Sequence, residues 1–121
     1  MRIWIPGKFP NLNDYIKAER ANRFAAAGMK KKWTEAVKDA CINGKGLAPV
    51  NVEFPVTVYF TVHEENKRRD VDNVSATVSK FCLDGLVKAG ILPDDSQKYV
   101  NKIECDLVVD DKVGVEILID E

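Results

Sequence analysis

The sequence has few of the residues from which common hydrolytic and metal centres are built. It contains one histidine, His63, and three widely spaced cysteines with no C-x-x-C pair. A zinc finger needs clustered Cys and His ligands, and a Ser-His-Asp or Cys-His centre would have to use His63, which precedes two glutamates at the end of an apolar run. These absences argue against both kinds of chemistry. The cysteines fit small buried residues in a reducing compartment.

A long apolar run is also missing. No segment approaches the ~20 apolar residues that cross a bilayer, and the apolar stretch in residues 1–6 is too short and interrupted for a signal peptide. We therefore expect a cytoplasmic protein with no membrane attachment. The length of 121 residues and the 45% hydrophobic content predict one globular domain over residues 1–121.

Charge is nearly balanced in total but segregated along the chain. The net charge is −1, yet residues 1–45 hold ten basic and four acidic side chains, whereas residues 81–121 hold four basic and ten acidic ones. The total does not demand a polyanionic partner. The segregation is compatible with one, because a basic surface can attract phosphates while acidic residues elsewhere serve other purposes.

Periodicity and turn residues predict the order β-α-β-α-β-β. Alternating apolar residues indicate strands, which cover residues 2–5, 52–63, 103–109 and 113–119. Residues 110–112 are predicted to turn the last two strands into a hairpin. The economical packing is an α+β fold, with a mixed or antiparallel sheet of about four strands and two helices on one face.

The helices are predicted from apolar residues that recur every three to four positions. Residues 15–43 contain no proline and form one helix, or two helices joined near Gly28, that begins after an asparagine cap at Asn11 or Asn13. A second helix spans residues 74–89 and ends at Gly90, since glycine is the usual residue just after a helix.

Four aspartates form the candidate chemical centre. Asp70 and Asp72 stand at the junction between a strand and the second helix, and the Asp94-Asp95 pair comes after that helix, roughly 25 Å along its axis. The two sets meet only if residues 91–97 fold back along the sheet edge, which is the arrangement expected here. Three carboxylates without histidine would make an oxygen site suited to Mg²⁺ or Mn²⁺. Beside basic residues, such a site could hydrolyse a phosphodiester.

The same aspartates also fit structural roles. Asp70 or Asp72 could cap the following helix, and Asp94-Asp95 could belong to a turn. The segment from Asp70 is also similar to the first motif of haloacid-dehalogenase-type phosphatases, although that motif needs a hydrophobic strand where Lys67-Arg68-Arg69 stands. From the residues alone, these interpretations stay open beside the metal site.

Three motifs in a fixed order carry a family resemblance. They are the R-D-x-D-N sequence at 69–73, Lys80 four residues before Asp84, and Asp94-Asp95-Ser96. Together they resemble the RusA-type Holliday junction resolvases, the crossover junction endodeoxyribonucleases common in prophages. Residues 6–13 and the basic helix after them are similar to members from Gram-positive bacteria and their phages. The resemblance covers nearly the whole chain.

The resemblance implies a homodimer that binds four-way DNA junctions and makes paired symmetric nicks with Mg²⁺, for which Mn²⁺ may substitute. By position, it implies that Asp70, Asp72 and Asp95 bind the metal and that Lys80 assists catalysis. The residues expected to bind DNA are Lys30, Lys31, Lys32, Lys67, Arg68, Arg69 and Asn73. Recognition is expected to be mainly of shape and phosphate.

Two features depart from the family pattern. The step from Asn73 to Lys80 is about one helical turn (~6 Å) longer than in the best-known form of the motif, which leaves Lys80 on nearly the same face but farther from the metal. Lys80 could instead form an ion pair with Asp84. The net charge is slightly acidic, so junction binding requires the basic residues to gather on one surface. The competing function is a DNA-junction-binding protein without turnover.

Overall fold

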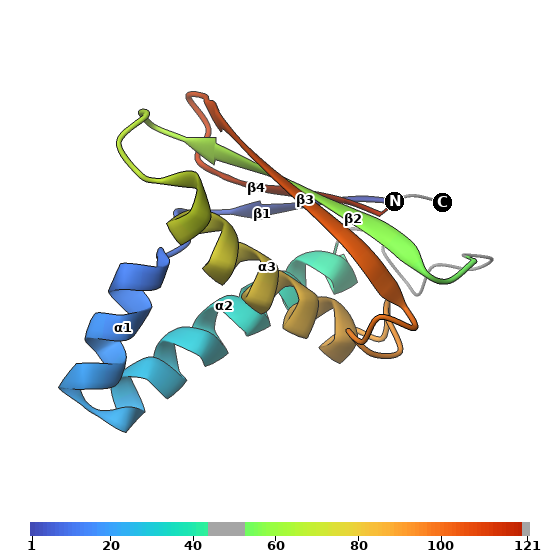
Figure 1. Cartoon of the computed structure of the whole chain (residues 1–121), viewed down its shortest axis with the longest axis horizontal. Helices are drawn as coiled ribbons and strands as arrows, with labels where there is room; N and C mark the ends of the chain where they lie inside the picture. Colours follow the sequence, from blue (N-terminus) through green and yellow to red (C-terminus); the bar gives the residue numbers. More distant parts are fainter. Residues whose placement is uncertain (44–52, 120–121) are drawn as a thin grey trace.

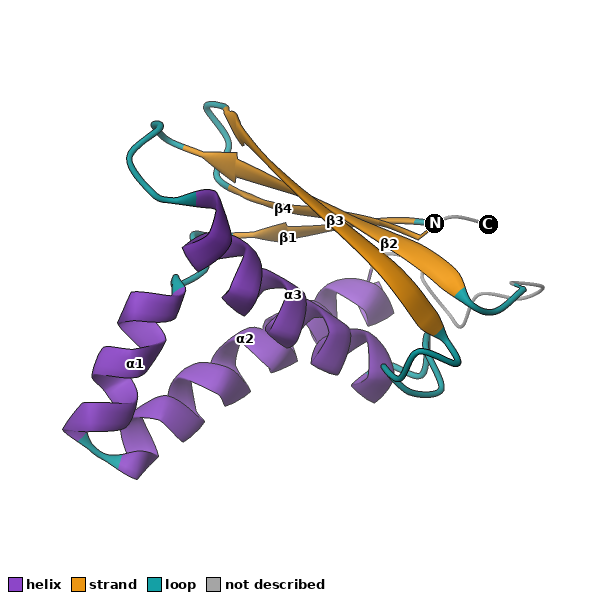
Figure 2. Ribbon diagram, in the orientation of Figure 1, coloured by secondary structure: helices purple, strands orange, loops and turns teal. Residues whose placement is uncertain are grey.

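The computed structural model describes residues 1–43 and 53–119 of the chain. Within these residues, one sheet is covered on one face by helices (Figures 1 and 2). The elements in order are β1 (Arg2–Pro6), α1 (Leu12–Ala21), α2 (Arg23–Asn43), β2 (Val56–Glu64), α3 (Val71–Lys88), β3 (Val100–Val109) and β4 (Gly114–Ile119). The predicted α+β fold with a four-stranded mixed sheet is confirmed, but with three helices in place of two. No helix among the described residues is long and apolar enough to cross a bilayer.

The N-terminal helical segment divides at Asn22 and not near Gly28. Asn22 has an extended backbone, with φ −172° and ψ 160°, and its side-chain oxygen accepts a hydrogen bond from the backbone N–H of Ala25 at 2.8 Å. A short amide that can satisfy a free N–H stops one helix and starts the next. Gly28 stays inside α2, because a single glycine weakens a helix by only about 1 kcal/mol. Asn11 caps α1 as expected.

The strand order is β1-β4-β2-β3, and the predicted hairpin between the last two strands is wrong. β3 runs parallel to β2, from the pair Val56↔Val100 to the pair Glu64↔Val109. β4 lies antiparallel to β2 on its other side. Alternation in the sequence identifies both final strands, but it does not specify their partner. Here both pair with the central strand β2, and residues 110–113 connect one side of it to the other.

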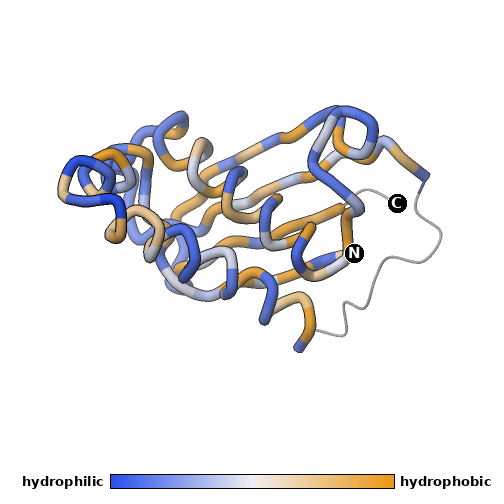
Figure 3. Tube along the Cα trace, turned by 90° about the horizontal axis from the view of Figure 1, so that it is seen from below, coloured by the Kyte–Doolittle hydropathy of each residue, from blue (hydrophilic) through white to orange (hydrophobic). Residues whose placement is uncertain are grey.

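The core lies between the sheet and the helices α2 and α3. Hydrophobic and hydrophilic residues alternate along the elements, which is consistent with one buried side on each (Figure 3). The buried hydrophobic side chains of β2 and α3 are Val56, Val58, Phe60, Val62, Val74, Val78, Phe81, Cys82 and Leu86. α2 and α3 approach closely at Gly85 of α3, where an added Cβ would lie 2.5 Å from the Cβ of Val37 on α2.

The end of α3 agrees with the predicted glycine pattern. Gly90 has a φ of +80°, and the N–H groups of Gly90 and Ile91 bond back to the carbonyls of Val87 and Leu86 at 3.0 Å each. Because β2 and β3 are parallel, α3 must carry the chain back to the end of the sheet where both strands begin. The residues just before α3 and those just after it therefore lie at opposite ends of the sheet.

Candidate metal and DNA site

Asp70 and Asp72 lie together at the start of α3, and both are exposed. Asp70 occupies the N-cap position, but its side chain makes no capping hydrogen bond. Asp72 lies in the first turn, where one carboxylate oxygen accepts a hydrogen bond from the N–H of Asn73 at 2.9 Å. Asp70 therefore holds the cap position considered for it, but its side chain forms no capping hydrogen bond. Two carboxylates face solvent at the helix N-terminus, where the helix dipole favours negative charge.

Arg69 directs its guanidinium inward. Nε and Nη2 donate to the two carboxylate oxygens of Glu64 at 2.8 and 2.7 Å, and Nη1 donates to the carbonyl of Phe9 at 2.6 Å. The Arg69 side chain is only 13% exposed. It joins the end of β2, the β1–α1 connection and the start of α3. Of the three basic residues predicted to contact DNA here, Lys67 and Arg68 are exposed, whereas Arg69 is committed to this contact.

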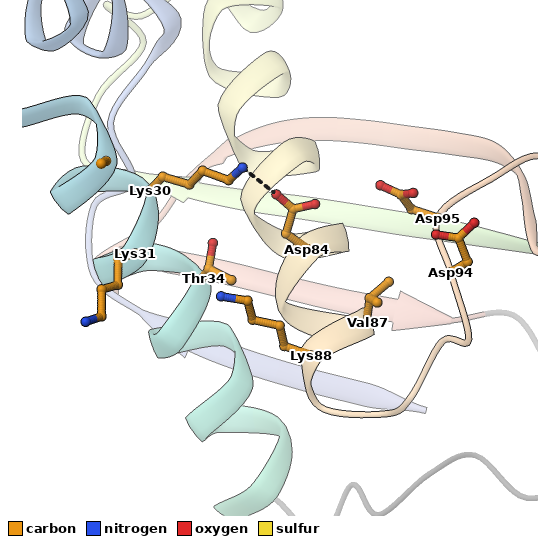
Figure 4. A pocket seen from close by; sticks show the side chains of 9 residues that line it. Lys30, Lys31, Thr34, Asp84, Val87, Lys88, Asp94 and Asp95 are labelled. Atoms are coloured by element: carbon orange, nitrogen blue, oxygen red, sulfur yellow. Dashed lines mark ion pairs between the residues drawn. The ribbon is translucent and has the colours of Figure 1, made fainter. Parts of the chain in front are cut away.

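Asp94 and Asp95 lie at the other end of α3, on the exposed connection to β3. Hydrogen bonds from the Asp95 backbone and the Ser96 side chain lower the pKa of the Asp94 carboxyl. The two aspartates border a cavity of about 540 Å³ between α2 and α3 (Figure 4). Its lining residues are Ala27, Lys30, Lys31, Thr34, Asp84, Val87, Lys88, Asp94 and Asp95.

One chain does not unite its two sets of aspartates. Asp70 comes after the end of β2, whereas Asp95 precedes the start of the parallel strand β3. Between them lies α3, whose 18 residues span about 27 Å. The expectation that residues 91–97 fold back along the sheet edge is wrong. Among residues 1–43 and 53–119, no three His, Cys, Asp or Glu side chains are grouped closely enough to hold a metal.

Lys80 lies between the two acidic ends. Its ammonium is 3.6 Å from one carboxylate oxygen of Asp84, and Lys30 of α2 lies 3.6 Å from the other oxygen. The ion pair considered for Lys80 is therefore present. Lys80 is eight residues, or about 12 Å along the axis, from Asp72. Its side chain is 59% exposed, so it can turn toward a ligand bound over α3.

Sequence reasoning missed Glu64, although a signal for it exists. The even-numbered residues of β2, from Val56 to Val62, are buried. Glu64 is the next even-numbered residue, so the pattern predicts that it is buried too. A carboxylate buried at the end of a strand needs a cationic partner. Lys67, Arg68 and Arg69 follow within five residues, and the structure shows that Arg69 is the partner. The spacing of Asp84 from Lys80 predicts one of its two ion pairs. The second, with Lys30 of α2, could not be predicted from spacing.

A comparison with known protein families finds a match over most of the chain. The chain matches the family model described as Endodeoxyribonuclease RusA over residues 6–120. This range contains Asp70, Asp72, Lys80 and Asp95, together with every described element except part of β1. No curated protein matches the chain.

Proposed function

The chain belongs to the RusA family of endodeoxyribonucleases, the Holliday junction resolvases, and we propose on this basis that it is a Mg²⁺-dependent homodimer. It resolves four-way DNA junctions by paired, symmetric nicks during recombination and repair. The observation that carries the proposal is the pair of exposed carboxylates at the start of α3, inside the matched range. A cytoplasmic location and a prophage origin stay predictions from the sequence.

Two copies can bring together what one chain separates. If two α3 helices run antiparallel across a twofold axis, the end of one lies beside the start of the other. The partner subunit's Asp95 would then complete the oxygen ligand set that Asp70 and Asp72 begin. Each dimer would contain two such sites, one for each strand to be nicked. Because the two sets of aspartates lie at ends of α3 that are about 27 Å apart in one chain, a complete ligand set would require two copies.

The surface of α3 supports this arrangement. At 100° per residue, five positions fall within an arc of about 80°: Asp72, Ala76, Lys80, Leu83 and Val87. All five are exposed or half-buried. The stripe runs from the first acidic end almost to the second. Its small and apolar members provide a surface on which a second helix can pack, as far as the described residues show.

The proposed ligands suit the ion. Asp70, Asp72 and the partner subunit's Asp95 provide only carboxylate oxygens, which Mg²⁺ and Mn²⁺ prefer. Bound there, the ion would activate water and neutralise charge on the phosphoryl oxygens. Lys80, released from Asp84, would stabilise negative charge that develops on the phosphate or the leaving oxygen. Asp84 holds the ammonium groups of Lys80 and Lys30 near α3 until DNA replaces it.

The proposed DNA contacts come from exposed basic residues on two elements. Lys67 and Arg68 lie beside Asp70, and Lys30, Lys31 and Lys32 lie on α2. Their charges would track phosphates and not read bases. Asn73 stays a candidate contact because it lies in the first turn of α3 beside Asp72.

A nicking assay tests the function. A synthetic four-way junction is incubated with the protein and Mg²⁺, and with EDTA, and the Asp72→Asn variant is compared. We expect paired nicks only for the unmodified protein with Mg²⁺, whereas Asp72→Asn binds the junction without nicking it. Asp106→Asn, an exposed substitution on β3, is the matched control and should nick normally. Junction binding without nicks under Mg²⁺ or Mn²⁺ would support the passive binder instead.

A further inference from the structure

The end of the α1–α2 hairpin, where α1 stops and α2 begins, projects away from the sheet (Figure 1). α1 has no buried residue, and residues 19–24 at the end of the hairpin are all exposed. Phe24 lies at this end and is 73% exposed. The other exposed large apolar side chains of the described residues range from 38% to 55%. The most exposed of these side chains therefore stands at the outermost part of a projecting element.

The surroundings of Phe24 are basic. The guanidinium carbon of Arg23 lies 5.1 Å from the centre of the phenyl ring. Arg20 and Lys17 stand on the last turns of α1, and Glu19 is the acidic residue in the segment 17–24. None of these three cations makes an ion pair within the part of the chain that the structure describes. An exposed ring beside cations without acidic partners is suited to stack on a nucleobase while the cations hold phosphates.

We infer that Phe24, with Arg20 and Arg23, contacts the branch point of the DNA junction. The phenyl ring stacks on a base at the crossover, and the two guanidiniums hold the phosphates on either side. This inference rests on the proposed function and adds the residues that select branched DNA. In a continuous duplex, every base face is covered by its neighbours, so the same contact would first require unstacking. At a crossover, that requirement is smaller.

The chemistry of the hairpin end favours DNA over a protein partner. A stable protein interface buries about 800 Å² on each side around an apolar centre. The hairpin end has one apolar aromatic ring among mostly hydrophilic residues. A single ring and several cations match one base and its neighbouring phosphates.

Base unstacking can be measured without cleavage. The protein carrying Asp72→Asn is bound in EDTA to a junction with 2-aminopurine at the branch point. We expect its fluorescence to rise on binding, because the base leaves its neighbours. Adding Phe24→Ala should abolish most of that rise and lower the preference for junction over duplex by roughly tenfold. Phe24→Trp should restore both, since tryptophan also stacks.

The matched control is Ile42→Ala. Ile42 is 52% exposed on the same helix, near its other end, and its loss should change neither readout. Both substitutions are on the surface, and circular dichroism is expected to show unchanged folding and melting. A Phe24→Ala protein that binds the junction with full fluorescence rise and full preference would overturn the inference. If the Asp72→Asn protein itself does not bind junctions, the proposed function fails, and this inference with it.

Discussion

Glu64 and Arg69 form a buried bidentate ion pair at 2.8 and 2.7 Å. Glu64 is the last residue of β2, and Arg69 directly precedes Asp70 in the sequence. Their side chains are 5% and 13% exposed. The arginine of the R-D-x-D-N motif thus supports the acidic residues after it, because it ties the start of α3 to the sheet and to the Phe9 carbonyl.

We predict that Arg69→Ala lowers the free energy of unfolding by about 3 kcal/mol, since it leaves the Glu64 carboxylate buried without its partner. Glu64→Gln should also destabilise the protein, because the buried guanidinium then lacks a counter-charge. Chemical denaturation monitored by circular dichroism measures both. Lys67→Ala, at an exposed neighbouring residue, should change stability by less than about 0.5 kcal/mol.

The salt dependence of junction binding distinguishes a residue that contacts DNA phosphates from one that only supports the fold. In EDTA, Lys67→Ala should reduce the slope of log K against log salt by about one, whereas Arg69→Ala should leave the slope unchanged. If Arg69→Ala keeps full stability and reduces the slope, Arg69 is a phosphate contact, as the sequence alone suggested.

Two inactive variants should restore each other if the site spans two copies. Mixing Asp72→Asn with Asp95→Asn protein, with subsequent unfolding and refolding, gives mixed dimers in about half of the population. In each mixed dimer, one site keeps all three carboxylates. The other site lacks both the Asp72 and the Asp95 carboxylates. We expect nicks in one strand only, at a rate well above that of either variant alone. A mixture as inactive as its components would place all three ligands within one chain.

A pair of glycine substitutions tests the packing of α2 on α3. Gly85→Ala should destabilise the protein by about 2 kcal/mol, because its Cβ would lie 2.5 Å from the Cβ of Val37. Gly28→Ala is the control, since a Cβ there meets no atom within 4 Å. It should stabilise the protein by about 0.5–1 kcal/mol through helix propensity. Equal effects on the melting temperature would contradict the close helix contact.

Cysteine labelling tests the core. Burial raises the pKa of the Cys41 thiol to about 11 and also raises the pKa of the Cys82 thiol well above its usual value. At pH 8, Cys41 should therefore hold roughly a hundredfold less thiolate than a free cysteine and react correspondingly slowly. Mass spectrometry after alkylation, with and without denaturant, measures this at each site. Rapid labelling of Cys41 in the native protein would contradict its burial.

Much of the local structure could be predicted because its causes are local. The alternation from Val56 to Val62 requires a strand with one buried face, and Gly90 ends α3 since it adopts a positive φ at low cost. The break at Asn22 was misplaced at Gly28. Both residues interrupt helices, and only the capping bond to Ala25 decided between them.

Local sequence patterns were enough to predict the α+β class and the family, because periodicity and motif spacing are properties of neighbouring positions. The tertiary structure alone decided which strands pair and which side chains meet. It placed β3 parallel to β2, and this pairing sends Asp95 to the opposite end of α3 from Asp70. It also turned Arg69 inward to Glu64. Strand pairing and buried charge depend on the whole chain folding around one core, so no short segment specifies them.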